Sequence, residues 1–93
     1  MKNNNEARAI VTIIGKDRVG ILAAAAVEIA KMGANVITVS QNVNSSLFTM
    51  MMEIDIENMT GSCDDLSKNI SSRLKDMKVS VMNSEIFNSM HTI

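Results

Sequence analysis

The sequence has no proline, tryptophan or tyrosine, and it contains only two phenylalanines and one cysteine. With Cys63 alone, no disulfide can form within the chain. The scarcity of aromatic residues and the net charge of −1 exclude the basic and stacking pattern by which proteins bind nucleic acid. No apolar run approaches the ~20 residues that a membrane span requires, so we expect no membrane contact.

Residues for catalysis and for metal binding are equally scarce. His91 is the only histidine and lies near the end of the chain, where a solvated surface residue is the simplest interpretation. Met50, Met51 and Met52 are soft metal ligands in principle, but alternation along a strand would point them to opposite faces. The sequence shows no recognisable combination of a nucleophile, a base and a residue that orients the base. We therefore predict a protein that is not an enzyme, with no catalytic residue, no metal and no cofactor.

What the sequence does contain is typical of one small globular domain. It has 93 residues, of which 46% are apolar and 20% charged, and nine are methionines that fill irregular gaps in a core. We expect residues 1–7 to form a flexible tail and residues 8–93 to form a single domain. The polar N-terminus does not resemble a secretion signal, so we expect a cytoplasmic location.

Alternation of apolar and polar residues predicts four strands, over residues 8–14, 35–43, 47–56 and 79–83. The first of these is apolar on both faces, which favours a central position in the sheet. The third shows the clearest alternation. Its expected core face holds Phe48, Met50, Met52, Ile54 and Ile56, whereas Leu47 and Met51 are expected on the other face.

Two helices are predicted from apolar residues at helical spacing. The first covers residues 19–32, and its expected core stripe consists of Ile21, Leu22, Ala25, Ile29 and Met32. The second begins after Ser62, which with Asp65 forms a variant of the capping box. Its stripe consists of Leu66, Ile70, Leu74 and Met77. A short helical turn after residue 83 is expected to close the chain.

The predicted order is β-α-β-β-α-β. In a single domain, this order favours an α+β sandwich in which a four-stranded antiparallel sheet carries both helices on one face. Each β-α-β half must cross over in the right-handed sense. The expected fold is therefore the ferredoxin-like arrangement, with the short C-terminal helical turn added to it.

The turn between the first strand and the first helix, residues 15–21 with the sequence GKDRVGI, is the expected binding site. Amide groups at a helix start favour a negatively charged ligand group, and Lys16 and Arg18 add positive charge. Asp17 is expected to cap the helix, with contact to a ligand ammonium as the alternative. The spacing of Gly15 and Gly20 matches a P-loop, but the Lys-Ser/Thr pair that should follow is absent, so nucleotide hydrolysis is not expected.

Three segments together resemble the ACT domain, a regulatory module that binds amino acids. They are VTIIGKDRVGI at residues 11–21, GANV at residues 33–36 and SQ at residues 40–41. The segments FTMM at residues 48–51 and IFNSMH at residues 86–91 resemble a subgroup of short, stand-alone ACT-domain proteins from bacteria and archaea whose function is uncharacterised. The family often has proline where Val19 stands, and this difference leaves the turn amide available.

This resemblance implies a protein that associates with itself and binds an amino acid or similar carboxylate between two copies. One side of the implied site is the turn of one copy, with Asp17, Arg18, Val19, Gly20 and Ile21. The other side is the second strand of a neighbouring copy, with Asn35, Val36, Ser40 and Gln41.

Two functions remain open from the sequence. The first is a regulatory module that binds an amino acid and acts as a homodimer or higher oligomer. The second is a docking module that binds no ligand and regulates a separate protein through its surface. In either case we expect the regulated protein to be another chain.

Overall fold

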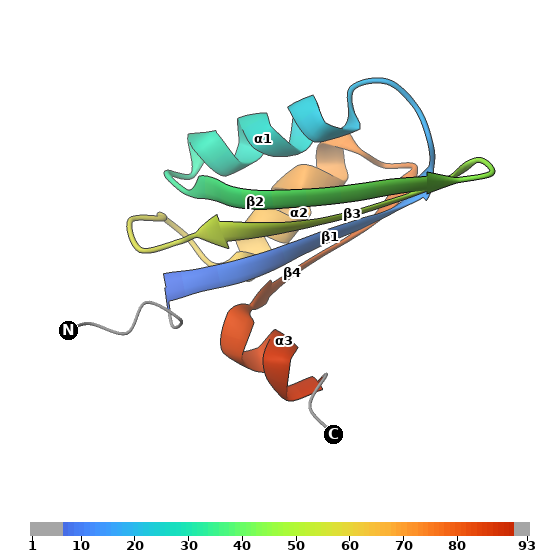
Figure 1. Ribbon diagram of the computed structural model, residues 1–93. Coiled ribbons are helices and arrows are strands. Elements are labelled where there is room, and N and C mark those ends of the chain that lie inside the picture. Colours follow the sequence, from blue (N-terminus) through green and yellow to red (C-terminus); the bar gives the residue numbers. More distant parts are fainter. Residues whose placement is uncertain (1–6, 91–93) are drawn as a thin grey trace.

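A computed structural model describes residues 7–90 of the protein, so residues 1–6 of the predicted tail, His91 and the last two residues lie outside it. The described chain folds as a sandwich of one sheet and two long helices, followed by a third, short helix (Figure 1). The elements are β1 (Arg8–Lys16), α1 (Ile21–Lys31), β2 (Asn35–Asn44), β3 (Leu47–Asp55), α2 (Cys63–Arg73), β4 (Met77–Asn83) and α3 (Ser84–Met90).

The four strands form one antiparallel sheet in the order β2-β3-β1-β4. β1 lies in the centre, as its two apolar faces predicted. Val11 of β1 stands opposite Met52 of β3 on one side and opposite Val81 of β4 on the other. The predicted ferredoxin-like fold is confirmed.

The hydrophobic core lies between the sheet and the two long helices, α1 and α2. From the strands it receives the inward residues Ala9, Val11, Ile13, Phe48, Met50, Met52, Ile54 and Met77. The helices and the segment after α1 contribute Ile21, Ala25, Ile29, Met32, Ala34, Leu66, Ile70 and Leu74. The alternation predicted for β3 is confirmed, because Leu47 and Met51 are exposed on the opposite face.

The predicted capping box at the start of α2 is also confirmed. The Ser62 hydroxyl accepts a hydrogen bond from the Asp65 amide at 3.1 Å, and the Asp65 carboxylate accepts one from the Ser62 amide at 3.0 Å. These two bonds satisfy donors that a helix start leaves without partners. Farther along the sandwich, Arg73 of α2 forms an ion pair with the nearly buried Glu28 of α1.

Three details of the first helix differ from the prediction. α1 begins at Ile21, not at residue 19, and Gly20 is its N-cap residue. Asp17 therefore lies too far before the helix to cap it, and no side chain caps α1. Leu22, assigned to the core stripe, is 38% exposed, because the sheet meets α1 along the row of Ile21, Ala25 and Ile29.

β2 is an edge strand, and all ten of its residues are exposed. Its pairing with β3 slips by one residue between Val36 and Thr38, which is a β-bulge. The second edge strand, β4, leads directly into α3, which projects beyond the sheet and away from α1 (Figure 1). None of the helices in residues 7–90 has the length and apolar character needed to cross a bilayer.

Candidate functional site

The conformation of the β1–α1 turn is fixed by a hydrogen bond to the β2–β3 hairpin and by one glycine. The Asp17 amide donates a hydrogen bond of 2.9 Å to the Ser46 carbonyl of the hairpin. Gly20 has φ 92° and ψ 5°, a left-handed conformation that residues with a Cβ rarely adopt. A Cβ at Gly20 would meet no atom within 4 Å, so the backbone angle requires glycine there, not the available space.

Between this turn and the end of β2 lies a depression of about 290 Å³, here called the turn depression. Its lining comes from three places in the chain: the turn with the start of α1, the second half of β2, and the start of β3. The lining residues are Asp17, Arg18, Gly20, Ile21, Leu22, Gln41, Asn42, Val43 and Phe48.

Five of the nine residues predicted for the site line the turn depression: Asp17, Arg18, Gly20, Ile21 and Gln41. Val19 is 94% exposed and does not line it. Ser40 lies on the opposite face of the sheet. Asn35 is six residues from Gln41, which is about 20 Å along an extended strand, so Asn35 and Val36 do not reach the turn of their own chain.

Four lining residues were not predicted: Leu22, Asn42, Val43 and Phe48. The sequence did carry a signal for Asn42 and Val43, because the predicted hairpin returns at residues 44–46 and brings the end of β2 close to the end of β1. Phe48 was correctly assigned to the core face. Its position at the beginning of β3 also leaves it at the floor of the depression.

Arg18 is engaged by a residue distant in the sequence. Its guanidinium donates hydrogen bonds of 2.8 Å and 3.1 Å to the two carboxylate oxygens of Asp76, in the turn between α2 and β4. These bonds lower the pKa of the Asp76 carboxyl below its ordinary value, and the same contact raises the pKa of Arg18. The Arg18 guanidinium, which the sequence offered to a ligand, is therefore already paired with Asp76.

Asp17 is in the opposite situation. Within residues 7–90, its carboxylate does not cap α1 and forms no ion pair. The first helical hydrogen bond of α1 is donated by Ala24 to the Gly20 carbonyl at 3.0 Å, so the amides of Ile21, Leu22 and Ala23 precede it. The turn depression thus combines a free carboxylate with the amide end of a helix, a pairing that suits a zwitterion.

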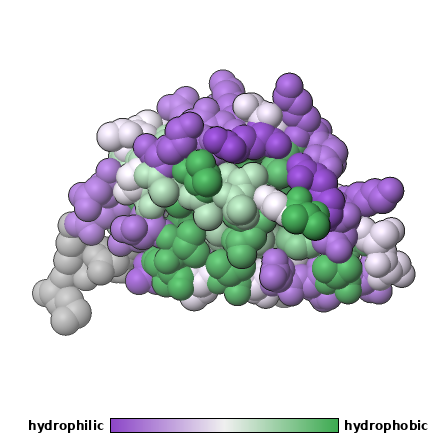
Figure 2. All heavy atoms as spheres, turned by 90° about the horizontal axis from the view of Figure 1, so that it is seen from above, coloured by the Kyte–Doolittle hydropathy of each residue, from purple (hydrophilic) through white to green (hydrophobic). Residues whose placement is uncertain are grey.

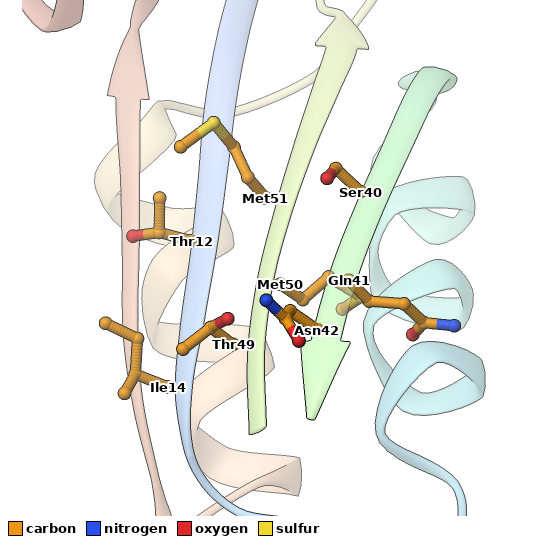
Figure 3. A pocket seen from close by; sticks show the side chains of 8 residues that line it. All are labelled: Thr12, Ile14, Ser40, Gln41, Asn42, Thr49, Met50 and Met51. Carbon is orange, nitrogen blue, oxygen red and sulfur yellow. The ribbon is translucent and has the colours of Figure 1, made fainter. Parts of the chain in front are cut away.

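A second depression, of about 320 Å³, lies on the sheet face that α1 and α2 leave open; we call it the open-face depression. Figure 3 looks onto this face, with the helices behind the strands. Its lining residues carry no charge: Thr12, Ile14, Ser40, Gln41, Asn42, Thr49, Met50 and Met51.

The residues described hold no group of three or more His, Cys, Asp or Glu side chains that could bind a metal ion. Cys63 is partly buried, and this burial raises the pKa of its thiol above the ordinary value. A raised pKa favours the protonated thiol and so lowers its reactivity.

An antiparallel ferredoxin-like sheet with a glycine turn at the start of α1 defines a class of small α+β domains, and comparison with known proteins places the chain within it. The sequence matches the ACT domain over residues 7–84. The protein therefore belongs to the ACT-domain family. It is 38% identical over 88 residues to a UPF0237 protein of Listeria monocytogenes, covering 92% of this chain and 99% of the relative. A UPF0237 protein of Methanocaldococcus jannaschii is 34% identical over 88 residues, covering 92% and 98%.

The fold is also similar to solved structures. An ACT domain protein from Streptococcus pneumoniae superimposes with a TM-score of 0.71 at 30% identity, covering 86% of this chain and 92% of that one. The regulatory subunit of aspartate kinase from Thermus thermophilus gives a TM-score of 0.63 at 18% identity, covering 84% and 52%. The family relationship predicted from the turn and the short C-terminal segment is thus confirmed.

Proposed function

We propose that this protein is a regulatory module that binds a small amino acid, or a similar carboxylate, in the turn depression and acts as a homo-oligomer. ACT domains are regulatory modules that bind small molecules, and this coarser role holds for the family to which the chain belongs. The observation that carries the finer proposal is the pairing of the free Asp17 carboxylate with the uncapped start of α1.

The two ends of the turn depression suit the two charges of an amino acid. The ligand carboxylate accepts hydrogen bonds from the amides at the start of α1, where the helix dipole favours a negative charge. The ligand ammonium lies against Asp17. The Gln41 side-chain amide, which reaches the depression from β2, is available to either group. A volume of about 290 Å³ suits a small ligand.

Self-association is supported by the β2 edge. One side of β2 pairs with β3, and its other side has no neighbouring strand among residues 7–90. Apolar side chains there and on the outer surface of α1 are about 40–50% exposed: Leu22, Val27, Val36, Ile37, Val39 and Val43. Figure 2 looks onto α1 and this edge and shows apolar residues gathered between hydrophilic borders. An unprotected apolar edge strand is a template for pairing with another chain.

Pairing of two β2 strands would also complete the site. Antiparallel pairing centred on the middle of Asn35–Asn44 sets the partner's Asn35 opposite Asn44 and the partner's Val36 opposite Val43. Val43 lines the turn depression. The two predicted site residues that a single chain holds far from its turn would then be supplied by the second copy.

The test is calorimetric titration of the protein with each common amino acid. We expect binding of a small amino acid, abolished by Asp17→Asn because the ammonium loses its counter-charge. Asp64→Asn, on the exposed surface of α2, is the matched control and should bind as the wild type does. Failure of the wild type to bind any of these ligands would contradict the proposal.

The second candidate function is a docking module that acts without a ligand. It is favoured by the same exposed β2 edge, which can pair with a different protein as well as with a second copy. Light scattering separates the two: a protein that is monomeric at tens of micromolar and binds no amino acid would support docking on a separate partner.

A further inference from the structure

The proposed function leaves two apolar features of the chain without a partner. One is α3, in which Ile86 and Met90 are 57% and 62% exposed. The other is the open-face depression, where Ile14 and Met51 are each 44% exposed. Neither α1 nor α2 covers this face, and α3 projects away from the helical layer (Figure 1).

α3 needs a surface to pack on. A helix of seven residues is too short to be stable in water from its own hydrogen bonds, so packing must supply the stability. Its main contacts with its own chain are to β1 and β4. Ile86 and Met90 are four residues apart and therefore share one face of the helix, and that face stays exposed. Burial of the Ile86 and Met90 side chains in an apolar, uncharged hollow is more favourable than their exposure to water.

The open-face depression has the matching properties. Figure 3 shows Thr12, Ile14, Thr49 and Met51 on the side of the strands that faces away from α1 and α2. The floor combines methyl and thioether groups with hydroxyl groups, and none of the lining residues is charged. Met51 is an adaptable side chain that can shape itself to an inserted aliphatic group.

Charges at the borders of the two features are complementary. Lys78 of β4 stands directly opposite Ile14, at the edge of the depression. Within residues 7–90, it forms no ion pair. Glu85 precedes Ile86 on α3, and its side chain is likewise without an ion pair in this part of the chain.

We propose that α3 of one copy packs into the open-face depression of a second copy, with Ile86 and Met90 against Ile14 and Met51 and with Glu85 beside the partner's Lys78. A twofold axis midway between α3 and the depression relates the two copies. In the resulting symmetric dimer, each α3 packs into the open-face depression of the other copy. This contact is separate from the β2 edge. With both surfaces in use, the smallest closed assembly is a tetramer.

Disulfide trapping between two different variants tests the contact directly. Both carry Cys63→Ser; one also carries Met51→Cys and the other Met90→Cys. On mild oxidation of the mixture we expect a linked pair containing one chain of each kind. The control mixes the Met90→Cys chain with a Val39→Cys chain, whose cysteine lies on the β2 edge, and it should give little of this product.

Reversal of the two charges provides an independent measurement. Lys78→Glu and Glu85→Lys should each reduce the fraction in the α3-dependent assembly several-fold by light scattering, and the double variant should restore it. No linked pair above the control would overturn the proposal. A chain carrying both Met51→Cys and Met90→Cys that links only within itself would also overturn it, because α3 would then cover its own sheet. Amino-acid binding is measured on the same samples, so a failure of the proposed function remains distinguishable.

Discussion

The guanidinium of Arg18 and the carboxylate of Asp76 form a bidentate ion pair, with hydrogen bonds of 2.8 Å and 3.1 Å. The two residues are 58 positions apart in the sequence. The pair fastens the β1–α1 turn to the turn that precedes β4. Asp76 and any anionic ligand would therefore compete for Arg18, the only arginine that lines the turn depression.

Removal of Asp76 should therefore strengthen ligand binding. In Asp76→Asn, Arg18 is free to approach a ligand carboxylate, and we expect several-fold tighter binding of the amino acid in calorimetric titration. The double variant Arg18→Ala, Asp76→Asn should lose this gain. Equal affinity of wild type and Asp76→Asn would mean that Arg18 does not contact the ligand.

The cost of replacing Gly20 should depend on how well the new residue adopts the left-handed backbone conformation at this position. At φ 92°, a residue with a Cβ is strained by roughly 1–2 kcal/mol, and a β-branched residue by more. Because the surrounding space is empty, Gly20→Asn should lower the midpoint of urea unfolding less than Gly20→Val. Similar midpoints for the two variants would show that the turn relaxes to another conformation. Gly20→Leu, if folded by circular dichroism, should block the ligand.

Leu74→Ala should destabilise the whole domain. Leu74 is 1% exposed at the end of α2, and truncation of a buried leucine costs about 2–5 kcal/mol through lost burial and the cavity left behind. Ser72→Ala, on the exposed side of the same helix, should change the free energy of unfolding by less than about 0.5 kcal/mol. Chemical denaturation followed by circular dichroism measures both, and equal effects would contradict the assignment of the helix faces.

Stability should fall on acidification, and Glu28 should account for part of the loss. The hydrogen bond from Arg73 lowers the pKa of the Glu28 carboxyl in the folded protein. Because the folded pKa lies below the unfolded value of about 4.3, the contribution of Glu28 is fully present above that pH. It is lost as the pH falls through the folded pKa.

Glu28→Gln should therefore flatten the decline in thermal midpoint between pH 6 and pH 3. Its midpoint at pH 6 should be lower than that of the wild type, since Arg73 loses its charged partner. Asp64→Asn is the control, because its ion pair with Lys68 is exposed and its side chains lie far from the core. An unchanged slope in Glu28→Gln would show that other carboxyls dominate.

Local pattern was sufficient for most of the secondary structure. The alternation in β3, the apolar spacing of α2 and the Ser62–Asp65 capping box all depend on residues within a few positions of one another. Such short-range features hold in nearly any tertiary setting. For that reason the strands, the two helices and the ferredoxin-like fold followed from the sequence. The errors lie at the ends of elements: α2 ends at Arg73, so Met77, assigned to its stripe, is instead the first residue of β4.

The first helix shows the limit of local pattern. Asp17 is a good cap by type and position, but its amide is drawn to the Ser46 carbonyl of the hairpin. The left-handed angle at Gly20 then sets the start of the helix at Ile21. A hydrogen bond to the turn of a hairpin distant in the sequence outweighed a local preference, and the unused carboxylate became part of the candidate site.

The sequence by itself determined the order of the elements, the inward faces of β1 and β3, the capping of α2 and the family to which the protein belongs. Only the tertiary structure decided which residues meet across the site. It brought Gln41 to the turn, held Asn35 and Val36 away from it, and joined Arg18 to Asp76. The physical reason is that sheet pairing and turn packing fix distances between residues far apart in the chain, and no periodicity within one element encodes those distances.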